Sequence, residues 1–96
     1  MKTTVIFRKW NNGQIIAIFP EIPADHCYGH CMSYEHIGQH GTCAPGYVIH
    51  ATTQASEAEA LPIRKELESI GYELQVRLRY CESMQQRRFS EMRVEQ

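Results

Sequence analysis

The chain has 96 residues, with 10 basic and 11 acidic side chains and a formal net charge of −1. A chain of this length forms one domain, and its balanced charge gives no electrostatic argument for binding nucleic acid or a membrane surface. No apolar stretch reaches the length of a signal peptide or a membrane span, so we expect a cytoplasmic protein. Its 4 cysteines would then stay reduced and serve metal binding, reactivity or burial.

Two strands joined by a tight turn are predicted at the start of the chain. Residues 3–10 alternate and are rich in β-branched and aromatic side chains. Residues 14–19 are apolar on both faces, which is typical of a central strand. Between them, Asn12-Gly13 tolerates the positive φ angles of a primed turn. The pattern predicts a β-hairpin, and Pro20 ends its second strand.

The segment from residue 24 to residue 45 is the most unusual part of the sequence. It holds four of the five histidines and three of the four cysteines, and it is too long for a plain connection in so small a domain. We expect a functional loop here, which could include a short helix from Ser33 to about Gln39 with Ser33 as its N-cap. Residues 47–52 then alternate and predict a third strand.

A helix is predicted after this strand, because Ser56-Glu57-Ala58-Glu59 matches a capping box. Gly71 suits its C-terminal cap, and Pro62 falls inside its second turn, where we expect a bend. Four apolar residues form a stripe at helical spacing. They are Ala60, Ile63, Leu67 and Ile70.

The last predicted strand covers residues 73–81, which alternate between apolar and polar side chains. The apolar side chains, expected to face the core, are Leu74, Val76, Leu78 and Tyr80. Residues 83–96 are polar and weakly patterned, and would form a polar C-terminal tail, either a loosely docked helix or a frayed end.

The predicted order is therefore strand, strand, long loop, strand, helix, strand. Three strands before one helix favour an α+β fold, with a small, mostly antiparallel sheet and the helix packed on one face. The domain would span residues 1–82, including the His/Cys-rich loop at residues 24–45.

This loop is dense in side chains that bind metals. Its seven candidate ligands are His26, Cys27, His30, Cys31, His36, His40 and Cys43. Structural zinc takes four thiolate or imidazole ligands. In a helix, His36 and His40 would lie one turn apart on the same face, and Cys31 with either Cys27 or Cys43 would complete the site. No standard zinc-finger spacing is matched. The alternative is a metal-free loop of buried thiols and hydrogen-bonded imidazoles.

Catalysis is another use of the same residues. Cys31 could act as a thiolate nucleophile with His36 or His40 as its base, or the three could surround a catalytic metal. Free amides at Gly38 and Gly41 could then stabilise an oxyanion. The obvious carboxylates that could orient the base are Asp25 and Glu35.

Four runs of the sequence carry a resemblance to a group of other proteins. They are Val5-Ile6-Phe7-Arg8, Ile18-Phe19-Pro20-Glu21-Ile22-Pro23-Ala24, Ser33-Tyr34-Glu35-His36-Ile37-Gly38-Gln39-His40-Gly41 and Glu66-Leu67-Glu68-Ser69-Ile70-Gly71-Tyr72. Together they resemble a group of short uncharacterised bacterial proteins with a Ser-Tyr-x-His-Ile-Gly-Gln-His-Gly loop. The resemblance covers most of the chain up to about residue 80, and it implies no fold, activity or partner.

The chain is richer in metal-ligating side chains than the pattern of this group. The additional residues are His26, Cys27, His30 and Cys43. The ligands that the resemblance shares are therefore Cys31, His36 and His40.

We expect a small bacterial binding or interaction module whose His/Cys-rich loop forms the functional surface, with zinc as its candidate metal. The candidate metal ligands are Cys31, His36, His40 and Cys27. The candidate binding surface is formed by Tyr34, Gln39 and Gly41. The alternative is the small enzyme described above. The expected partner is an unidentified protein or small ligand, a homodimer is left open, and neither a membrane nor nucleic acid is expected.

Overall fold

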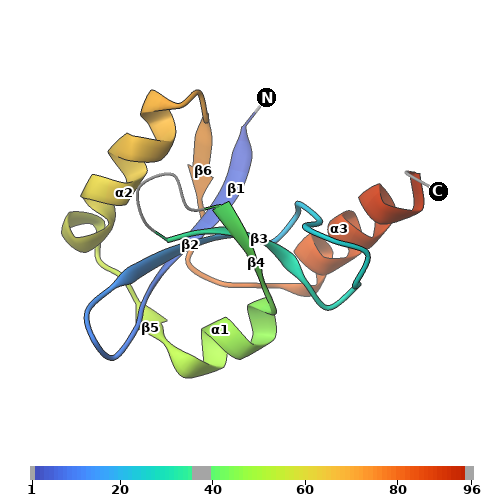
Figure 1. Ribbon diagram of the computed structural model, residues 1–96, viewed down its shortest axis with the longest axis horizontal. Helices are drawn as coiled ribbons and strands as arrows, with labels where there is room; N and C mark the ends of the chain where they lie inside the picture. Colours follow the sequence, from blue (N-terminus) through green and yellow to red (C-terminus); the bar gives the residue numbers. More distant parts are fainter. Residues whose placement is uncertain (1, 36–39, 95–96) are drawn as a thin grey trace.

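The computed structural model describes residues 2–35 and 40–94 and confirms the predicted α+β fold (Figure 1). Over these residues, six strands form one sheet: β1 (Thr3–Lys9), β2 (Ile15–Phe19), β3 (Cys31–Tyr34), β4 (His40–Cys43), β5 (Thr53–Gln54) and β6 (Leu74–Val76). Three helices accompany them: α1 (Pro45–Ala51), α2 (Glu57–Ser69) and α3 (Glu82–Val94). The strand order is β4-β3-β2-β1-β5, with β6 paired to β1 as well. The sheet is antiparallel apart from the β1–β6 pair, as predicted.

The first two strands form the predicted antiparallel hairpin. Gly13 has a φ of 89°, and its N–H donates to the carbonyl of Trp10 at 2.9 Å. The Trp10 N–H donates in turn to the carbonyl of Gln14. A primed turn would need a positive φ at Asn12 as well, and no described residue other than glycine has one. The turn is therefore a longer loop in which a single glycine supplies the left-handed conformation.

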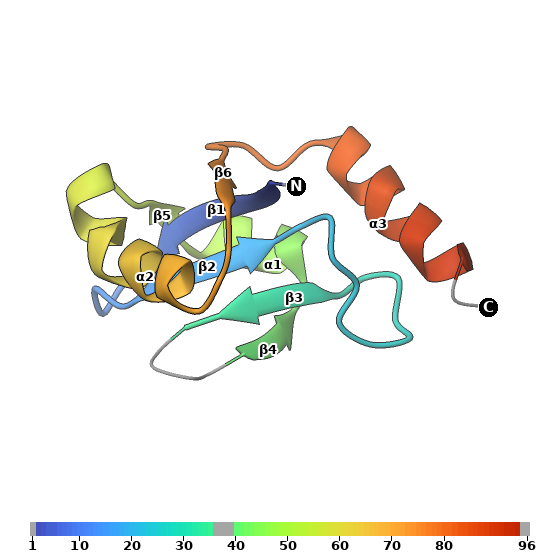
Figure 2. The ribbon, with the colours of Figure 1, turned by 90° about the horizontal axis from the view of Figure 1, so that it is seen from above.

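Strand β2 is central and buried on both faces, as its sequence predicted. One face packs against α2 in an apolar cluster of Val5, Phe7, Ala17, Phe19, Tyr34, Ala55, Ala60, Ile63, Leu67 and Leu74. The opposite face is covered by residues of α1 and α3 in a second cluster of Ile6, Ile16, Ile18, Cys31, Val48 and Met84. Figure 2 shows α2 and α1 on opposite sides of the sheet, with α3 beside the β2–β3 connection. The sequence predicted only the helix on the first face.

Helix α2 begins at the predicted capping box. The Ser56 hydroxyl accepts a hydrogen bond from the Glu59 N–H at 3.1 Å, and the Glu59 carboxylate accepts one from the Ser56 N–H at 2.9 Å. The helix continues without interruption through Pro62. The bend at Pro62 stays a prediction.

Helix α2 ends at Ser69 with Ile70 as its C-cap residue, and Gly71 follows with a φ of 111°, which confirms the glycine predicted at this helix terminus. The Gly71 N–H donates to the carbonyl of Glu68 and the Tyr72 N–H to that of Leu67, which is the bonding of a Schellman motif. Because the helix stops at residue 69, Ile70 turns away from the core and is 54% exposed. Its prediction as part of the buried stripe was wrong.

The predicted third strand at residues 47–52 is also wrong, because Pro45–Ala51 is helix α1. Pro45 at the first helical position has a φ angle already set for a helix, and Pro45, Val48 and Thr52 are buried at helical spacing. The C-terminal end of α1 is bonded to strand β1. The Arg8 guanidinium of β1 donates to the carbonyls of Ile49 and Thr52 at 3.0 and 2.8 Å. The alternation that suggested a strand covers only residues 47–52, a segment too short for the pattern to separate a strand from a helix.

The strand predicted at residues 73–81 is shorter than expected. Only Leu74–Val76 pairs with β1, and the last bond is from the Arg77 N–H to the carbonyl of Val5. Leu78 is 56% exposed and does not face the core. The chain leaves the sheet here and enters α3. Residues 83–96 were predicted to form either a loosely docked helix or a frayed end, and they are helical through residue 94. None of the helices over the described residues is long and apolar enough to cross a bilayer.

Candidate functional site

The β2–β3 connection, residues 20–30, is held in place by one buried cation from α3. The Arg88 side chain is 1% exposed, and its Nη1 donates to the Pro20 carbonyl at 2.7 Å and to the Tyr80 hydroxyl at 3.2 Å. Its Nη2 donates to the Tyr28 carbonyl at 3.1 Å. No described carboxylate forms an ion pair with Arg88, and its Nε has no described partner. One guanidinium therefore fixes both ends of this connection to α3.

Three metal-ligating side chains converge on the same connection. Asp25 Oδ1 accepts a hydrogen bond from the Cys27 N–H at 2.8 Å, which closes a tight Asx turn. Asp25 Oδ2 lies 2.9 Å from His30 Nδ1 and 3.5 Å from the Thr42 hydroxyl of β4. The ligating atoms of Asp25, Cys27 and His30 all lie within 4.8 Å of one another. The turn chemistry of Asp25 thus brings an oxygen, a sulfur and a nitrogen donor together.

Hydrogen bonds favour the ionised form of the Asp25 carboxylate. The hydrogen bond to His30, and then that from the Cys27 N–H, lower the pKa of Asp25 below its ordinary value. The carboxylate consequently stays ionised at mildly acidic pH. Carboxylate oxygen, thiolate sulfur and imidazole nitrogen are the ligand types that zinc takes in proteins, and three of them leave one of four tetrahedral positions open.

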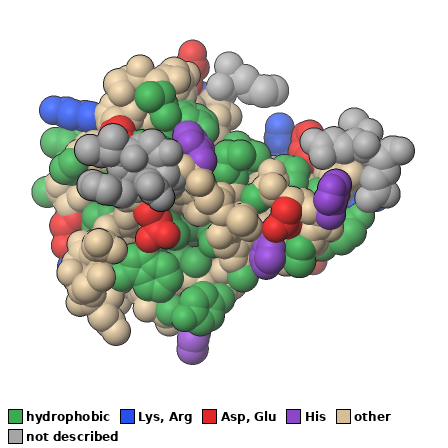
Figure 3. All heavy atoms as spheres, in the orientation of Figure 1, with side chains coloured by type: hydrophobic (Ala, Val, Ile, Leu, Met, Phe, Trp, Pro, Cys, Tyr) green, Lys and Arg blue, Asp and Glu red, His purple; other side chains and the backbone are tan. Residues whose placement is uncertain are grey.

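The cluster lies on a protruding surface and not in a cavity. Asp25 and Cys27 are exposed and His30 is half-buried. Histidine and acidic side chains lie together over this connection in Figure 3. Five hollows of 340 to 570 Å³ occur on the described surface, and none of them is lined by a residue of the cluster. A ligand at this site would be reached from solvent or from the surface of another molecule.

The candidate ligands from the sequence are divided between two places. Cys27 belongs to the cluster, but Cys31 lies one residue beyond it in β3 and is fully buried. Its Sγ lies 3.7 Å from Sγ of Cys43, the residue directly opposite in β4. The hydrogen bond with Cys43 and burial both raise the pKa of Cys31, which disfavours the thiolate that a nucleophile at this position would need.

His40 lies at the other end of the β3–β4 hairpin, opposite Tyr34, while Cys31 is opposite Cys43. The imidazole of His40 is edge-on to the Tyr34 ring, with centroids 4.8 Å apart, and its Nε2 lies 3.0 Å from the Tyr72 hydroxyl. Over residues 2–35 and 40–94, Cys31 and His40 share no cluster of three ligating atoms. The other histidine of that candidate site, His36, lies outside the described residues.

The short helix predicted from Ser33 is wrong where the structure describes it, because Cys31–Tyr34 is a strand. Ser33 is buried in the sheet and caps no helix. Its hydroxyl faces Gly41, where an added Cβ would lie 3.4 Å from Ser33 Oγ. Glu35 follows the strand and is not helical, and the part of the predicted helix that includes Gln39, residues 36–39, lies outside the described residues. His40, expected one helical turn after His36, lies in strand β4.

The candidate binding surface is likewise divided. Tyr34 is 1% exposed and donates a hydrogen bond from its hydroxyl to Glu66 of α2, so it belongs to the core and not to the surface. Gly41 is exposed in the edge strand β4. Gln39 lies outside the described residues.

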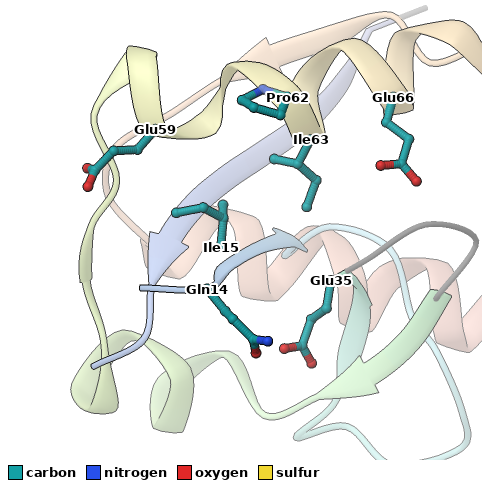
Figure 4. Close-up of a pocket in the computed structure, with 7 residues that line it drawn as sticks. All are labelled: Gln14, Ile15, Glu35, Glu59, Pro62, Ile63 and Glu66. Carbon is teal, nitrogen blue, oxygen red and sulfur yellow. The ribbon is translucent and has the colours of Figure 1, made fainter. Parts of the chain in front are cut away.

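A hollow of about 520 Å³ lies between β2 and α2, and Figure 4 shows the residues that line it. Ile15 and Ile63 form its apolar floor, and the Gln14 amide and the Glu35 carboxylate point toward one another at its edge. Two further carboxylates at its rim are already engaged, because Glu59 pairs with Lys9 and Glu66 accepts from Tyr34. These partners explain the acidic rim without a ligand.

Sequence reasoning considered Asp25 only as an orienting carboxylate and passed over Arg88 as a residue of a polar tail. The signal for the first was present as Asp25-x-Cys27-x-x-His30, since an aspartate two residues before a bonded amide is typical of an Asx turn. The burial of Arg88 carries no such local signal.

Comparison with known proteins gives no match to a family model, to a curated protein or to a solved structure.

Proposed function

We propose that this chain is a small binding module that holds a divalent transition metal, zinc in the first place, at Asp25, Cys27 and His30. The observation that carries the proposal is the convergence of these three donor atoms within 4.8 Å on an exposed connection. The cluster contains Cys27 and His30, two of the seven candidate ligands from the sequence, adds Asp25, and does not include Cys31 or His40.

The surroundings of the cluster favour zinc binding in three ways. Asp25 Oδ1 accepts from the Cys27 N–H, which orients the carboxylate so that Oδ2 is directed toward His30. The Thr42 hydroxyl at 3.5 Å from Oδ2 can support the carboxylate from the second coordination shell. His30 Nδ1 already lies 2.9 Å from Oδ2, so a metal would replace the proton that now lies between them.

The open fourth position defines the kind of partner. On a protruding surface, a donor side chain of another protein, or of a second copy of the chain, can complete the tetrahedron. The Arg88 anchor supports this role, because it holds the connection to α3 and spares a partner the entropic cost of ordering it. A cytoplasmic setting, in which Cys27 stays reduced, is part of the proposal.

A second candidate function follows from the same open position. A zinc ion with three protein ligands and one water is the arrangement of catalytic sites, where the metal supplies hydroxide near neutral pH. The five described hollows are lined by other residues, which favours the binding module over this enzyme. Zinc-dependent hydrolysis of an activated ester, lost in His30→Ala, would reverse this preference.

Zinc titration of the metal-free full chain, purified without a histidine tag, tests the proposal. We expect one zinc per chain by native mass spectrometry, and an affinity reduced about tenfold or more in Asp25→Asn, Cys27→Ser and His30→Ala. The matched controls are His50→Ala and Cys81→Ser, which remove an exposed histidine and an exposed cysteine outside the cluster. Equal affinity in the cluster and control variants would place the metal elsewhere.

A melting experiment gives an independent test. Because zinc would bind the folded chain and not an unfolded one, a saturating concentration should raise the melting temperature, and a strong chelator should reverse the increase. Identical curves with and without chelator, together with no zinc detected by mass spectrometry, would end the metal hypothesis.

A further inference from the structure

Cys31 and Cys43 form a close pair of thiols in the β3–β4 hairpin. The two residues lie directly opposite each other in β3 and β4, and their Sγ atoms are 3.7 Å apart. Opposed Cα atoms of antiparallel strands lie about 4.5–5.5 Å apart, inside the range of roughly 4.4–6.8 Å that a disulfide spans. The sulfur atoms need to approach by only about 1.7 Å to reach the bond length of about 2.05 Å.

Access to the two thiols is unequal. Cys43 is half-buried in the edge strand β4. Cys31 is 0% exposed, because it is part of the apolar cluster on the face toward α1 and α3. A reagent in solvent can therefore reach Cys43 but not Cys31.

We propose that Cys31 and Cys43 form a reversible intramolecular disulfide by exchange with a low-molecular-weight disulfide. The Cys43 thiolate attacks one sulfur of that disulfide, its S–S bond breaks, and the first small thiolate leaves. Cys31 then attacks Cys43 Sγ in the mixed disulfide and displaces the second small thiolate. The two protons of the protein thiols pass to the departing thiolates, so two protein thiols are oxidised by two electrons while one small disulfide is reduced to two thiols.

The other two cysteines provide an internal contrast. Cys27 and Cys81 are exposed, and neither has a thiol within hydrogen-bonding distance among the described residues. Cys81 Sγ instead lies 3.1 Å from the hydroxyl of Ser83. These two thiols can carry a small-molecule adduct, but they have no neighbouring thiol to displace it. The oxidation product therefore distinguishes the pair from an ordinary accessible cysteine.

The cross-link would join the edge strand β4 to β3 and close the chain between residues 31 and 43. An edge strand is the part of a sheet that opens most readily, because it is hydrogen-bonded on one side only. Oxidation should consequently stabilise the hairpin that carries Thr42, without consuming Cys27 of the metal cluster. The proposal does not depend on zinc binding.

The test uses the full chain with Cys27→Ser and Cys81→Ser, both at exposed positions, so that only Cys31 and Cys43 remain. After incubation with oxidised glutathione at neutral pH, acid quenching and intact mass spectrometry should detect a loss of about 2 Da with no adduct. Dithiothreitol should restore the original mass, and the oxidised form should melt at a higher temperature. An unchanged mass, or a glutathione adduct that persists, would overturn the proposal.

Two further variants in this background test the order of the steps. Cys31→Ser should accumulate one glutathione on Cys43, since the resolving thiol is absent. Cys43→Ser should stay free of adduct over the same time, because Cys31 is inaccessible in the folded chain. Equal adduct formation in both variants would contradict Cys43 as the entry point. The chain with only Cys27→Ser and Cys81→Ser tests disulfide formation by itself, so that test does not depend on whether these two variants fold.

Discussion

The two faces of the sheet are built on different principles. The face under α2 is packed with aliphatic and aromatic side chains, and the helix that covers it is defined at both ends by local hydrogen bonds. The face toward α1 and α3 includes a buried thiol, and α3 also buries a guanidinium that holds the β2–β3 connection. Helix α1 lacks a side-chain cap, and its end is bonded by Arg8 from another strand. The first face stabilises the fold. The second face also holds the β2–β3 connection, which carries the Asp25, Cys27 and His30 cluster.

Helix α3 illustrates why the second face is hard to recognise. Its buried side chains occur every fourth residue, at Met84, Arg88 and Met92, which is a helical stripe with a cation at its centre. Between them the helix is mostly polar and exposed. A charged residue at the middle of the stripe makes the pattern look like a solvated tail.

The largest effect should come from Arg88, the residue most characteristic of the second face. Arg88→Ala should lower the free energy of unfolding by about 3–5 kcal/mol, because it leaves a cavity, an unpaired buried carbonyl at Pro20 and an unpaired, partly buried carbonyl at Tyr28. Arg88→Met restores the volume and should cost less. The neighbouring exposed Arg87→Ala should change stability by no more than about 0.5 kcal/mol in the same urea titration. Similar midpoints for the two alanine variants would contradict the anchoring role.

On the first face, Leu67→Ala should lower the free energy of unfolding by about 2–5 kcal/mol, because Leu67 lies fully buried on the inner side of α2 and its truncation leaves a cavity. Ile70→Ala removes a side chain of similar size from the exposed end of the same helix, and should cost about 0.5 kcal/mol or less. Chemical denaturation of both variants measures the difference. Equal losses would mean that Ile70 packs in solution.

The capping box should contribute less. Ser56→Ala removes the hydroxyl that accepts from the Glu59 N–H and should lower the free energy of unfolding by about 1 kcal/mol. Ser90→Ala, an exposed substitution inside α3, is the matched control and should cause no such loss. If the control were the more destabilising of the two, the local signals of α2 would not be the source of its stability.

The smallest effect concerns pH. Hydrogen bonds with Lys9 and Ser56 lower the pKa of Glu59 from 4.5 to about 2, so the folded state favours its carboxylate. The stability that it contributes is complete above the ordinary value of 4.5 and is lost as the pH falls toward 2. Glu59→Gln should therefore be less stable than the wild type at pH 6, with a difference that narrows toward pH 2. Urea midpoints at intervals across this range measure it, and a constant difference would contradict the assignment.

Local patterns in the sequence were sufficient for the first face. The capping box at Ser56, the cap at Gly71 and the apolar strand at residues 15–19 act over a few neighbouring residues, so each could be recognised without knowing the fold. The density of histidine and cysteine also directed attention to the segment in which the cluster lies, since Cys27 and His30 belong to it.

The tertiary structure alone decided which of these side chains meet. Strand pairing placed Cys31 against Cys43 and separated it from His40, because opposite residues of a hairpin are set by register and not by spacing along the chain. Burial of Arg88 depends on carbonyls 60 and 68 residues away, and the end of α1 depends on Arg8, 41 residues from Ile49. Interactions over such distances leave no periodic trace in the sequence, since their energy arises only when the chain has folded.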